Sequence, residues 1–174
     1  MRSSSFKGLF LLGLVALLIF LGGCSIVPRE LRKEIDRSIS FKELKANPDA
    51  YGGRTVVSGG EIIETKNLKD HTELEILQKA LRQGDVPIES DKSEGRFLVN
   101  QSGYLDPAIF GSGRYITAVG EVMGSKSLLI GEAEYQYPVI SARFLHLWPK
   151  DLRCYYPFYC PFYFHWGFYF SYTH

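Results

Sequence analysis

The chain has 174 residues and a formal net charge of +1, which suits one domain with extensions and argues against an electrostatic grip on nucleic acid. Histidine and methionine are scarce, so neither a metal-rich nor a methionine-rich binding surface is expected. The aromatic residues are unevenly spread, because residues 154–174 hold 12 of the 25 Phe, Trp and Tyr side chains. The carboxyl-terminal segment therefore differs in composition from everything before it.

The amino terminus has the pattern of a secretory signal peptide. Arg2 and Lys7 supply a positive start, and the uncharged run from Leu9 to Leu21 follows. This run is shorter than the about 20 apolar residues that a helix needs to cross a bilayer. We therefore predict that residues 1–23 are a cleaved signal; the alternative is a short membrane anchor left in place.

The end of this run resembles the lipobox of bacterial lipoprotein precursors. Residues 21–24 are a leucine, two small residues and Cys24. The resemblance implies that Cys24 receives S-linked diacylglycerol, becomes the first residue after cleavage and takes an N-linked acyl chain. Several chains are needed, because one acyl chain alone anchors a protein only marginally. The expected partners are membrane lipid and the lipoprotein processing and sorting machinery, and no cofactor is expected besides this covalent lipid.

The residue after the cysteine has a sorting role in the same resemblance. Ser25 stands where an aspartate would retain an enterobacterial lipoprotein in the inner membrane, so transfer to the outer membrane is implied. Loss of residues 1–23 also leaves a nearly neutral mature chain with 18 basic and 19 acidic side chains. The expected location is the outer membrane of a Gram-negative bacterium, with a lipid-anchored domain that faces the periplasm.

The next segment is polar. Residues 24–39 mix both signs of charge, which predicts a lipidated amino terminus followed by a partly helical tether. A short helix is expected after it, because Ser40 and Glu43 have the spacing of a capping box. Asn47-Pro48 ends that helix.

Short strands are expected along the middle of the chain. Arg54–Lys66 is long and contains Gly59-Gly60, where a bulge or tight bend is predicted. Thr72–Leu81 fits both a strand and a helix face. Gly124-Ser125 predicts a hairpin turn. The other expected strands are Gly95–Gln101, Arg114–Met123, Ser127–Glu132 and Val139–Trp148.

Five or six short strands, the first interrupted by glycine, favour a mainly β fold. We predict a small antiparallel OB-like β-barrel over residues 40–149, with a short N-terminal capping helix. An aromatic-rich tail over residues 150–174 completes the predicted domain organisation. An open β-sandwich is the alternative fold.

The middle of the chain resembles a known family. It contains, in this order, the stretches NPDAYGGRTVVSGGEII, FLVNQSGYLDPAIF, GRYITAVGEVMG and YPVISARFLHLWP. These motifs lie between Ser40 and Pro149, and together with the lipobox they resemble the Slp family of enterobacterial outer-membrane lipoproteins, named for a starvation-inducible member. The resemblance implies a lipid-anchored outer-membrane protein, with links to stationary phase and acid stress in some members. It transfers no functional residue besides Cys24.

A hydrolase is the alternative function. Glu61 and Glu121 each follow a glycine in an expected strand and could form a carboxylate pair acting on a cell-wall or glycan substrate. Solvent-facing strand positions are the simpler interpretation. Ser102 lacks the first glycine of a nucleophile elbow, and Asp106-Pro107 is a natural turn, although Asp106 stays a hydrolase candidate. We therefore predict a non-catalytic lipoprotein whose barrel binds an unidentified envelope protein or glycan.

Two cysteines lie beyond the expected barrel. Cys154 and Cys160 are separated by a modest spacing, and an oxidising envelope favours a disulfide between them over two free buried thiols. His165 and His174 would complete a Cys₂His₂ set. Its spacing does not match the usual zinc sites, so no metal is expected.

The segment after Pro149 is almost uncharged. Pro157 and Pro161 prevent it from crossing a bilayer as one helix, and Tyr and Trp favour the boundary between water and lipid. Two interpretations stay open. The tail lies on the membrane or on a protein partner, or it folds back over an apolar face of the barrel.

Overall fold

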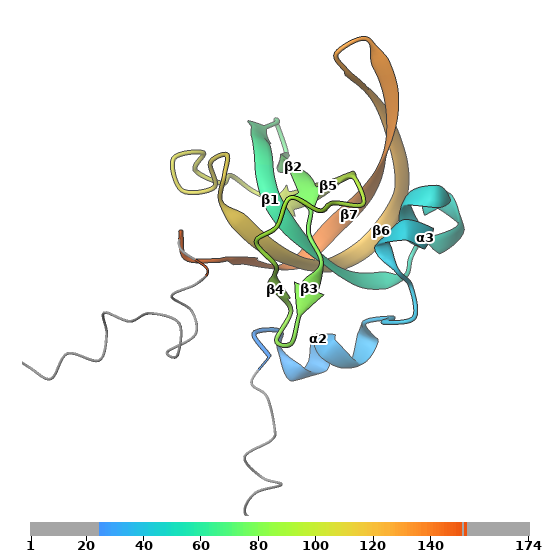
Figure 1. Cartoon of the computed structure of the whole chain (residues 1–174), viewed down its shortest axis with the longest axis vertical. Coiled ribbons are helices and arrows are strands. Elements are labelled where there is room, and N and C mark those ends of the chain that lie inside the picture. The colour runs from blue at the N-terminus through green and yellow to red at the C-terminus, as the bar shows by residue number, and fades with distance from the viewer. Residues whose placement is uncertain (1–24, 151, 153–174) are drawn as a thin grey trace, which may run out of the picture.

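Five strands close into a barrel in the computed structural model, which describes residues 25–150 and residue 152 (Figure 1). The barrel strands are β1 (Thr55–Asn67), β2 (His71–Gln78), β5 (Arg96–Ser102), β6 (Tyr115–Ile130) and β7 (Ala133–Leu147). Their order around the barrel is β1-β2-β5-β7-β6, and every pair of neighbours is antiparallel except β5 and β7. This arrangement confirms the predicted OB-like barrel, and its closure excludes the open β-sandwich.

Alternate residues of the strands fill the barrel, which settles the assignment of Thr72–Leu81. Leu74 and Ile76 on β2 are completely buried, whereas Leu77, the next residue of the same strand, is only half-buried. This period of two belongs to a strand and not to a helix. The buried core also includes Val56, Ile62, Phe97, Val99, Ile116, Ala118, Val122 and Ile140.

The paired glycines of β1 allow close strand contact and not a bulge. The register of β1 against β6 runs unbroken through Gly59 and Gly60, and the irregularity lies further on, between Ile62 and Glu64. A Cβ at Gly60 would lie 2.0 Å from the Leu77 carbonyl oxygen, a distance that no side chain tolerates. The glycines instead lie where β1 changes partner from β6 to β2, a point at which the backbones approach closely.

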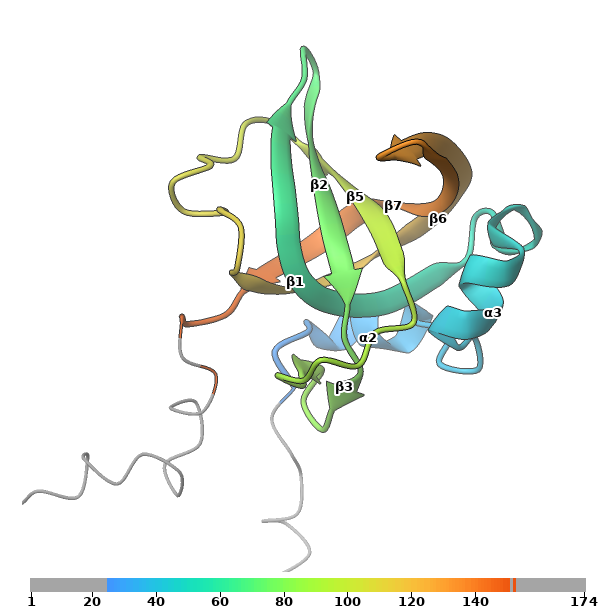
Figure 2. The same ribbon diagram turned by 45° about the horizontal axis from the view of Figure 1, so that its top comes forward.

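The hairpin turn predicted at Gly124-Ser125 is wrong. Strand β6 continues to Ile130, and the turn to β7 lies at Gly131, whose φ is +62°. Gly124 has a φ of +95° at a register shift inside the β6–β7 ladder, and a Cβ there would lie 2.7 Å from Asp49 Oδ1. The glycine is thus required by a bulge. The separate strand expected over Ser127–Glu132 is the far half of β6, and the long hairpin curls beside the barrel (Figure 2).

The helices precede the first barrel strand in the chain. Helix α3 (Phe41–Ala46) begins with the predicted capping box, in which the Ser40 hydroxyl accepts from the Glu43 N–H at 3.3 Å and the Glu43 carboxylate accepts from the Ser40 N–H at 2.9 Å. The helix ends at Asn47 as expected, and a 3₁₀ turn, η1 (Pro48–Tyr51), follows. Within the described ranges, no helix is long and apolar enough to cross a membrane.

The expected tether is instead part of the folded domain from Val27 onwards. Helix α2 (Arg29–Glu34) is present, as partial helicity predicted, but Val27, Leu31 and Ile35 are at least nine-tenths buried in a cluster with Val119 of β6. These three residues recur every four positions and form one apolar stripe along α2 and the residues that flank it. The charged residues between them made the segment look like a solvent-exposed tether in the sequence.

A second hairpin, β3 (Leu81–Arg82) with β4 (Val86–Pro87), was not expected. It lies beside α2 below the barrel in Figures 1 and 2. The three residues between its strands include Gly84 with φ +83° and Asp85 with φ +63°. Aspartate is one of the few side chains that adopt this backbone conformation readily. The hairpin places Asp85 against the barrel, where the candidate site begins.

Candidate functional site

A buried polar chain fixes the β3–β4 hairpin to the barrel. The Thr117 hydroxyl of β6 donates to the Asp85 carbonyl oxygen at 2.6 Å and accepts from the Trp148 indole N–H at 2.9 Å. Thr117 and Trp148 are completely buried, and Asp85 is 5% exposed. Hydrogen bonds in such surroundings hold the hairpin in one position, because breaking them would leave polar groups away from water.

The Asp85 carboxylate connects the hairpin to the amino-terminal segment. Arg37 donates to both of its oxygens, at 2.9 and 3.0 Å, and these hydrogen bonds raise the pKa of the Arg37 guanidinium above its ordinary value. The Ser25 hydroxyl donates to the same carboxylate at 3.3 Å. Arg32 donates to the carbonyl oxygen of Val27 at 2.9 Å and of Ser25 at 3.5 Å. We call Ser25, Arg32, Arg37 and Asp85 the Ser25 clamp.

Both ends of the described chain meet at this base of the barrel. Ile26, the residue after Ser25, packs against a buried cluster of Val86, Trp148 and Leu152. Leu152 is 2% exposed, so the first part of the expected tail belongs to the folded domain. The amino-terminal segment and the chain beyond β7 therefore leave the barrel from the same side.

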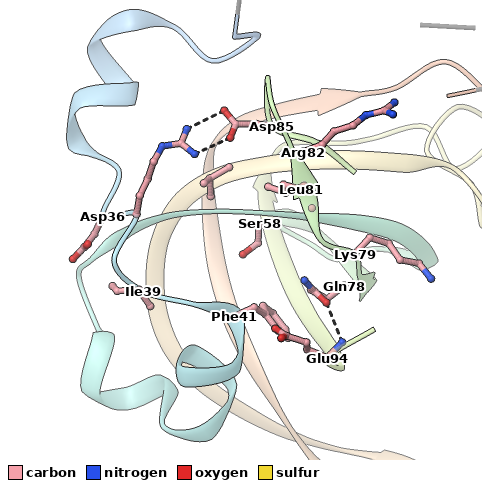
Figure 3. Close-up of a pocket in the computed structure, with 13 residues that line it drawn as sticks. Asp36, Ile39, Phe41, Ser58, Gln78, Lys79, Leu81, Arg82, Asp85 and Glu94 are labelled. Carbon is pink, nitrogen blue, oxygen red and sulfur yellow. Dashed lines mark hydrogen bonds and ion pairs between the residues drawn. The ribbon is translucent and has the colours of Figure 1, made fainter. Parts of the chain in front are cut away.

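A cleft of about 250 Å³ lies beside the Ser25 clamp (Figure 3). One wall is the segment from Asp36 to Phe41, the other is the end of β2 with the β3–β4 hairpin, and the floor is β1 at Val57–Gly59. Ile39, Phe41 and Leu81 add apolar side chains to a lining that is otherwise mostly polar or charged. A second hollow of about 560 Å³ shares Gln78 and Glu94 with this cleft and is also lined by Ala80, Ile88, Ser90, Lys92 and Ser93.

Two charged side chains beside the cleft, Asp36 and Lys79, have hydrogen-bond partners within the protein. Hydrogen bonds from the Ser38 hydroxyl and from Arg54 lower the pKa of the Asp36 carboxyl to about 2, so this group is charged at neutral pH. Lys79 is 3% exposed, and its Nζ donates to the Ser90 carbonyl oxygen at 2.6 Å. Arg82 and Glu94 also line the cleft, so a ligand would meet charged as well as neutral polar groups.

The outer face of β2 and β5, where OB-folds often bind ligands, is covered by the β6–β7 hairpin. Tyr137 of β7 is 2% exposed and donates to Glu75 of β2 at 2.9 Å, and Lys126 of β6 pairs with Glu73 at 2.6 Å. Leu98 of β5 is 1% exposed in an apolar cluster formed with the hairpin. This face is occupied by the protein itself.

The structure separates the carboxylates of the hydrolase hypothesis. Glu61 lies opposite Tyr115, whereas Glu121 lies opposite Thr55, six residues away along β1. Six residues of a strand span about 20 Å, too far for either two-carboxylate geometry of a glycosidase. Asp106 accepts from the Ala108 N–H at 2.9 Å and stabilises the turn, as its alternative interpretation predicted. None of the three residues lines either hollow of the described region.

Several sequence predictions fall outside the described residues. Cys24, Cys154 and Cys160 lie there, as do His165, His174 and the rest of the aromatic segment, so the lipid, the disulfide and the position of the tail stay predictions. Across residues 25–150 and 152, no group of three His, Cys, Asp or Glu side chains could hold a metal ion.

Asp85 and Gln78 line the candidate site but were not predicted from the sequence. The stretch Gln83-Gly84-Asp85 carries a turn signal that could have indicated a hairpin, since glycine followed by aspartate favours left-handed backbone. Nothing in the sequence around Gln78 distinguishes it from other polar strand residues, because its position depends on contacts with distant segments.

Comparison with known proteins gives three relatives. A protein of Haemophilus influenzae described as uncharacterised is 32% identical, over 87% of this chain and 82% of its own length. Outer membrane protein Slp of Escherichia coli is 28% identical, over 78% of this chain and 72% of its own. The lipoprotein YeaY of Escherichia coli is also 28% identical, over 75% of this chain and 67% of its own.

A solved structure also matches, with limited similarity. The N-terminal domain of PriB protein from Thermoanaerobacter tencongensis aligns with 55% of this chain and 96% of that domain, at 14% identity and a TM-score of 0.30. The fold assignment depends on the strand order of the barrel and not on this match.

The family itself is identified by a match to nearly the whole chain. A model of the outer membrane lipoprotein Slp family matches residues 21–173, which extends the resemblance past Pro149 through the aromatic segment. The chain therefore belongs to the Slp family of outer membrane lipoproteins.

Proposed function

We propose that Cys24 carries the lipid anchor and that the protein is a non-catalytic, periplasm-facing component of the outer membrane. The Ser25 clamp is the observation that supports this proposal most directly. The residue that would follow the lipidated cysteine is already fixed to the barrel, by Asp85 through its hydroxyl and by Arg32 through its carbonyl oxygen.

The clamp determines how the barrel would stand on the membrane. One residue spans at most about 3.6 Å, so acyl chains on Cys24 would begin within a few ångströms of the base. Ile26 and Leu152 pack in one cluster at that base, so the aromatic segment would also start close to the lipid surface. Aromatic side chains favour that boundary. We therefore propose that the base of the barrel rests on the membrane and that the distal end projects from it.

A binding role fits the barrel better than catalysis. Glu121 of β6 lies opposite Thr55, six residues along β1 from Glu61, and the described hollows are lined by neither glutamate. The cleft beside the clamp instead combines apolar, neutral polar and charged side chains in one hollow, which suits the recognition of a ligand.

Labelling with radioactive palmitate tests the anchor. We expect incorporation into the wild-type chain and none into Cys24→Ala, with the wild-type protein in the outer-membrane fraction. Incorporation that persists in Cys24→Ala would contradict this part of the proposal.

Limited trypsin digestion of the lipidated protein in vesicles tests the clamp. Cleavage at Arg29, Arg32, Lys33 and Arg37, read by mass spectrometry, requires this segment to leave the barrel. We expect cleavage about tenfold faster in Asp85→Ala, because a charge-assisted bidentate pair no longer opposes opening. Arg37→Gln should also accelerate cleavage although it removes one site. Asp91→Ala is the matched control on an exposed carboxylate; equal rates in all four proteins would show that the segment is not held.

A further inference from the structure

Strand β1 divides its backbone hydrogen bonds between two sides. At one end the Arg54 carbonyl oxygen accepts from the Val122 N–H at 2.9 Å, and at the other the Ile62 N–H donates to Arg114 at 2.8 Å. The register between these points has no shift. Even-numbered residues of β1 therefore bond to β6, and odd-numbered residues direct their N–H and C=O groups to the opposite edge.

That opposite edge is partly used by the protein itself. The Thr55 carbonyl oxygen accepts from the Asp36 N–H at 2.8 Å, and the Gly59 carbonyl oxygen accepts from the Lys79 N–H at 2.9 Å. Val57 lies between them, and neither its N–H nor its C=O has a partner on this edge among residues 25–150 and 152. The cleft occupies this gap, with Val57 in its floor.

Two side chains add hydrogen-bonding groups to the same cleft. Ser58 is 7% and Gln78 is 8% exposed. Gln78 Oε1 accepts from the Glu94 N–H at 3.0 Å, which fixes the orientation of the amide and turns its nitrogen toward the Ser58 side of the cleft (Figure 3). Within the described part of the chain, neither the Gln78 Nε2 group nor the Ser58 hydroxyl has a hydrogen-bond partner, so both are available to a ligand that enters the cleft.

These groups are complementary to an extended peptide. A free N–H and C=O on one residue of a strand edge form two hydrogen bonds with one residue of an added strand. A volume of about 250 Å³ is small for an organic ligand, but the second hollow continues beyond Gln78 and gives neighbouring residues of a peptide room.

We propose that the gap at Val57 docks an extended segment of a partner protein, which pairs with the β1 edge and accepts a hydrogen bond from Gln78. The site does not depend on the lipid. It can therefore fail while the anchor is confirmed, and the reverse also holds.

The first test is amide hydrogen exchange by NMR on the mature chain, residues 24–174, with Cys24→Ser. We expect the Val57 amide to exchange at least about tenfold faster than Val56 and Ser58, whose amides bond to β6. Equal protection of the three amides would overturn the proposal. So would protection of Val57 that disappears on truncation after Leu152, which keeps the buried Leu152 in the domain, because the protein's own carboxyl-terminal segment would then occupy the edge.

The second test is titration with a blocked tripeptide, N-acetyl-Ala-Val-Ala-N-methylamide. We expect binding with a Kd on the order of 1 mM, since so few atoms are in contact, together with slowed exchange at Val57. The analogue with an N-methylated valine lacks the pairing N–H and should bind about tenfold more weakly. Equal binding of both peptides, or binding of N-acetylglucosamine alone, would overturn the proposal.

A pair of variants locates the tripeptide. Gln78→Glu keeps the acceptor for the Glu94 N–H but removes the amide donor, so binding should weaken about tenfold. Gln101→Glu makes the same change on β5, outside the cleft, and should bind like the wild type. Unchanged binding by Gln78→Glu would place the tripeptide elsewhere and contradict the assignment.

Discussion

The outer face of β2 and β5 and the edge of β1 at Val57 offer opposite conditions to a ligand. On the face, the β6–β7 hairpin buries Leu98 and supplies a partner to each of Glu73 and Glu75. At the edge, the chain supplies partners on both sides of Val57 and leaves this residue open. A barrel that shares the OB strand order has thus lost the face on which such barrels often bind and retained a short strand edge.

This difference shows that fold alone does not locate a site. The strand order predicts the β2–β5 face as the binding surface, and a 16-residue strand β6 with a 15-residue partner β7 removes that surface. If the hairpin is a permanent part of the core, mutations beneath it should destabilise the whole domain. If the edge is a functional opening, mutations in it should leave stability almost unchanged.

The largest effect is expected from Leu98→Ala. Leu98 is 1% exposed between β5 and the hairpin, so truncation should lower the free energy of unfolding by about 3 kcal/mol through lost burial and a residual cavity. Urea denaturation measures this change. Leu129→Ala, on the same hairpin but 70% exposed, is the matched control and should stay within about 0.5 kcal/mol. A loss below about 1 kcal/mol for Leu98→Ala would mean that the hairpin is only loosely applied to the face.

The next effect concerns the wall of the open edge. Thr117→Val removes both the donor to the Asp85 carbonyl and the acceptor of the Trp148 N–H at a completely buried position. We expect a loss of about 2 kcal/mol, since each buried hydrogen bond contributes about 1 kcal/mol. Thr65→Val provides a comparison at a hydroxyl with one carbonyl partner, where a smaller loss is expected. Thermal denaturation of the two variants gives the order, and the reverse order would contradict this account of the hairpin.

The sequence predicts the parts of the fold that depend on neighbouring residues. The capping box at Ser40 is a short-range pattern and is confirmed. The pattern of Thr72–Leu81 fitted a strand and a helix, and only the burial along β2 distinguishes them. Gly124 misled the prediction because a bulge and a hairpin turn favour the same residue, and only the approach of Asp49 distinguishes them. The burial of Val27 and Leu31 was not predicted, because charged residues separate them in the sequence and only one side of this segment is buried.

The candidate site could not be predicted for a different reason. The gap at Val57 exists because Asp36 and Lys79 bond to β1 on either side of it, and neither residue is near Val57 in the chain. A sequence pattern identifies a strand, but the partners of its edges depend on tertiary structure. The open edge is therefore a property of the distant segments that bond to β1 and not of the sequence around Val57.

A smaller effect with a distinct pH dependence is expected from Tyr137→Phe. Burial raises the pKa of the Tyr137 hydroxyl from 10.0 to about 12, and its hydrogen bond to Glu75 contributes further. Folding thus favours the protonated hydroxyl, and the stabilisation is complete below pH 10 and lost as the pH rises through about 12. The variant should lose about 1 kcal/mol at pH 7 and less at pH 12. A difference from the wild type that stays constant over this range would show that the hydroxyl does not titrate as the geometry requires.

The smallest effect is expected at the open edge, from Ser58→Ala. A hydroxyl that is 7% exposed normally contributes a hydrogen bond, and its removal from a satisfied site costs about 1 kcal/mol. Ser58 has no such partner in the described structure and lies in the floor of the cleft, so we expect a change within about 0.5 kcal/mol in chemical denaturation. The matched comparison is Thr72→Val on β2, where the hydroxyl donates its one proton toward Asn67 Oδ1 at 2.6 Å and the Gly103 carbonyl at 2.8 Å and accepts from the Leu105 N–H at 3.0 Å. The loss there should exceed about 1 kcal/mol. If Ser58→Ala is as damaging as Thr72→Val, the hydroxyl serves the folded core, and the contrast between the covered face and the open edge no longer holds.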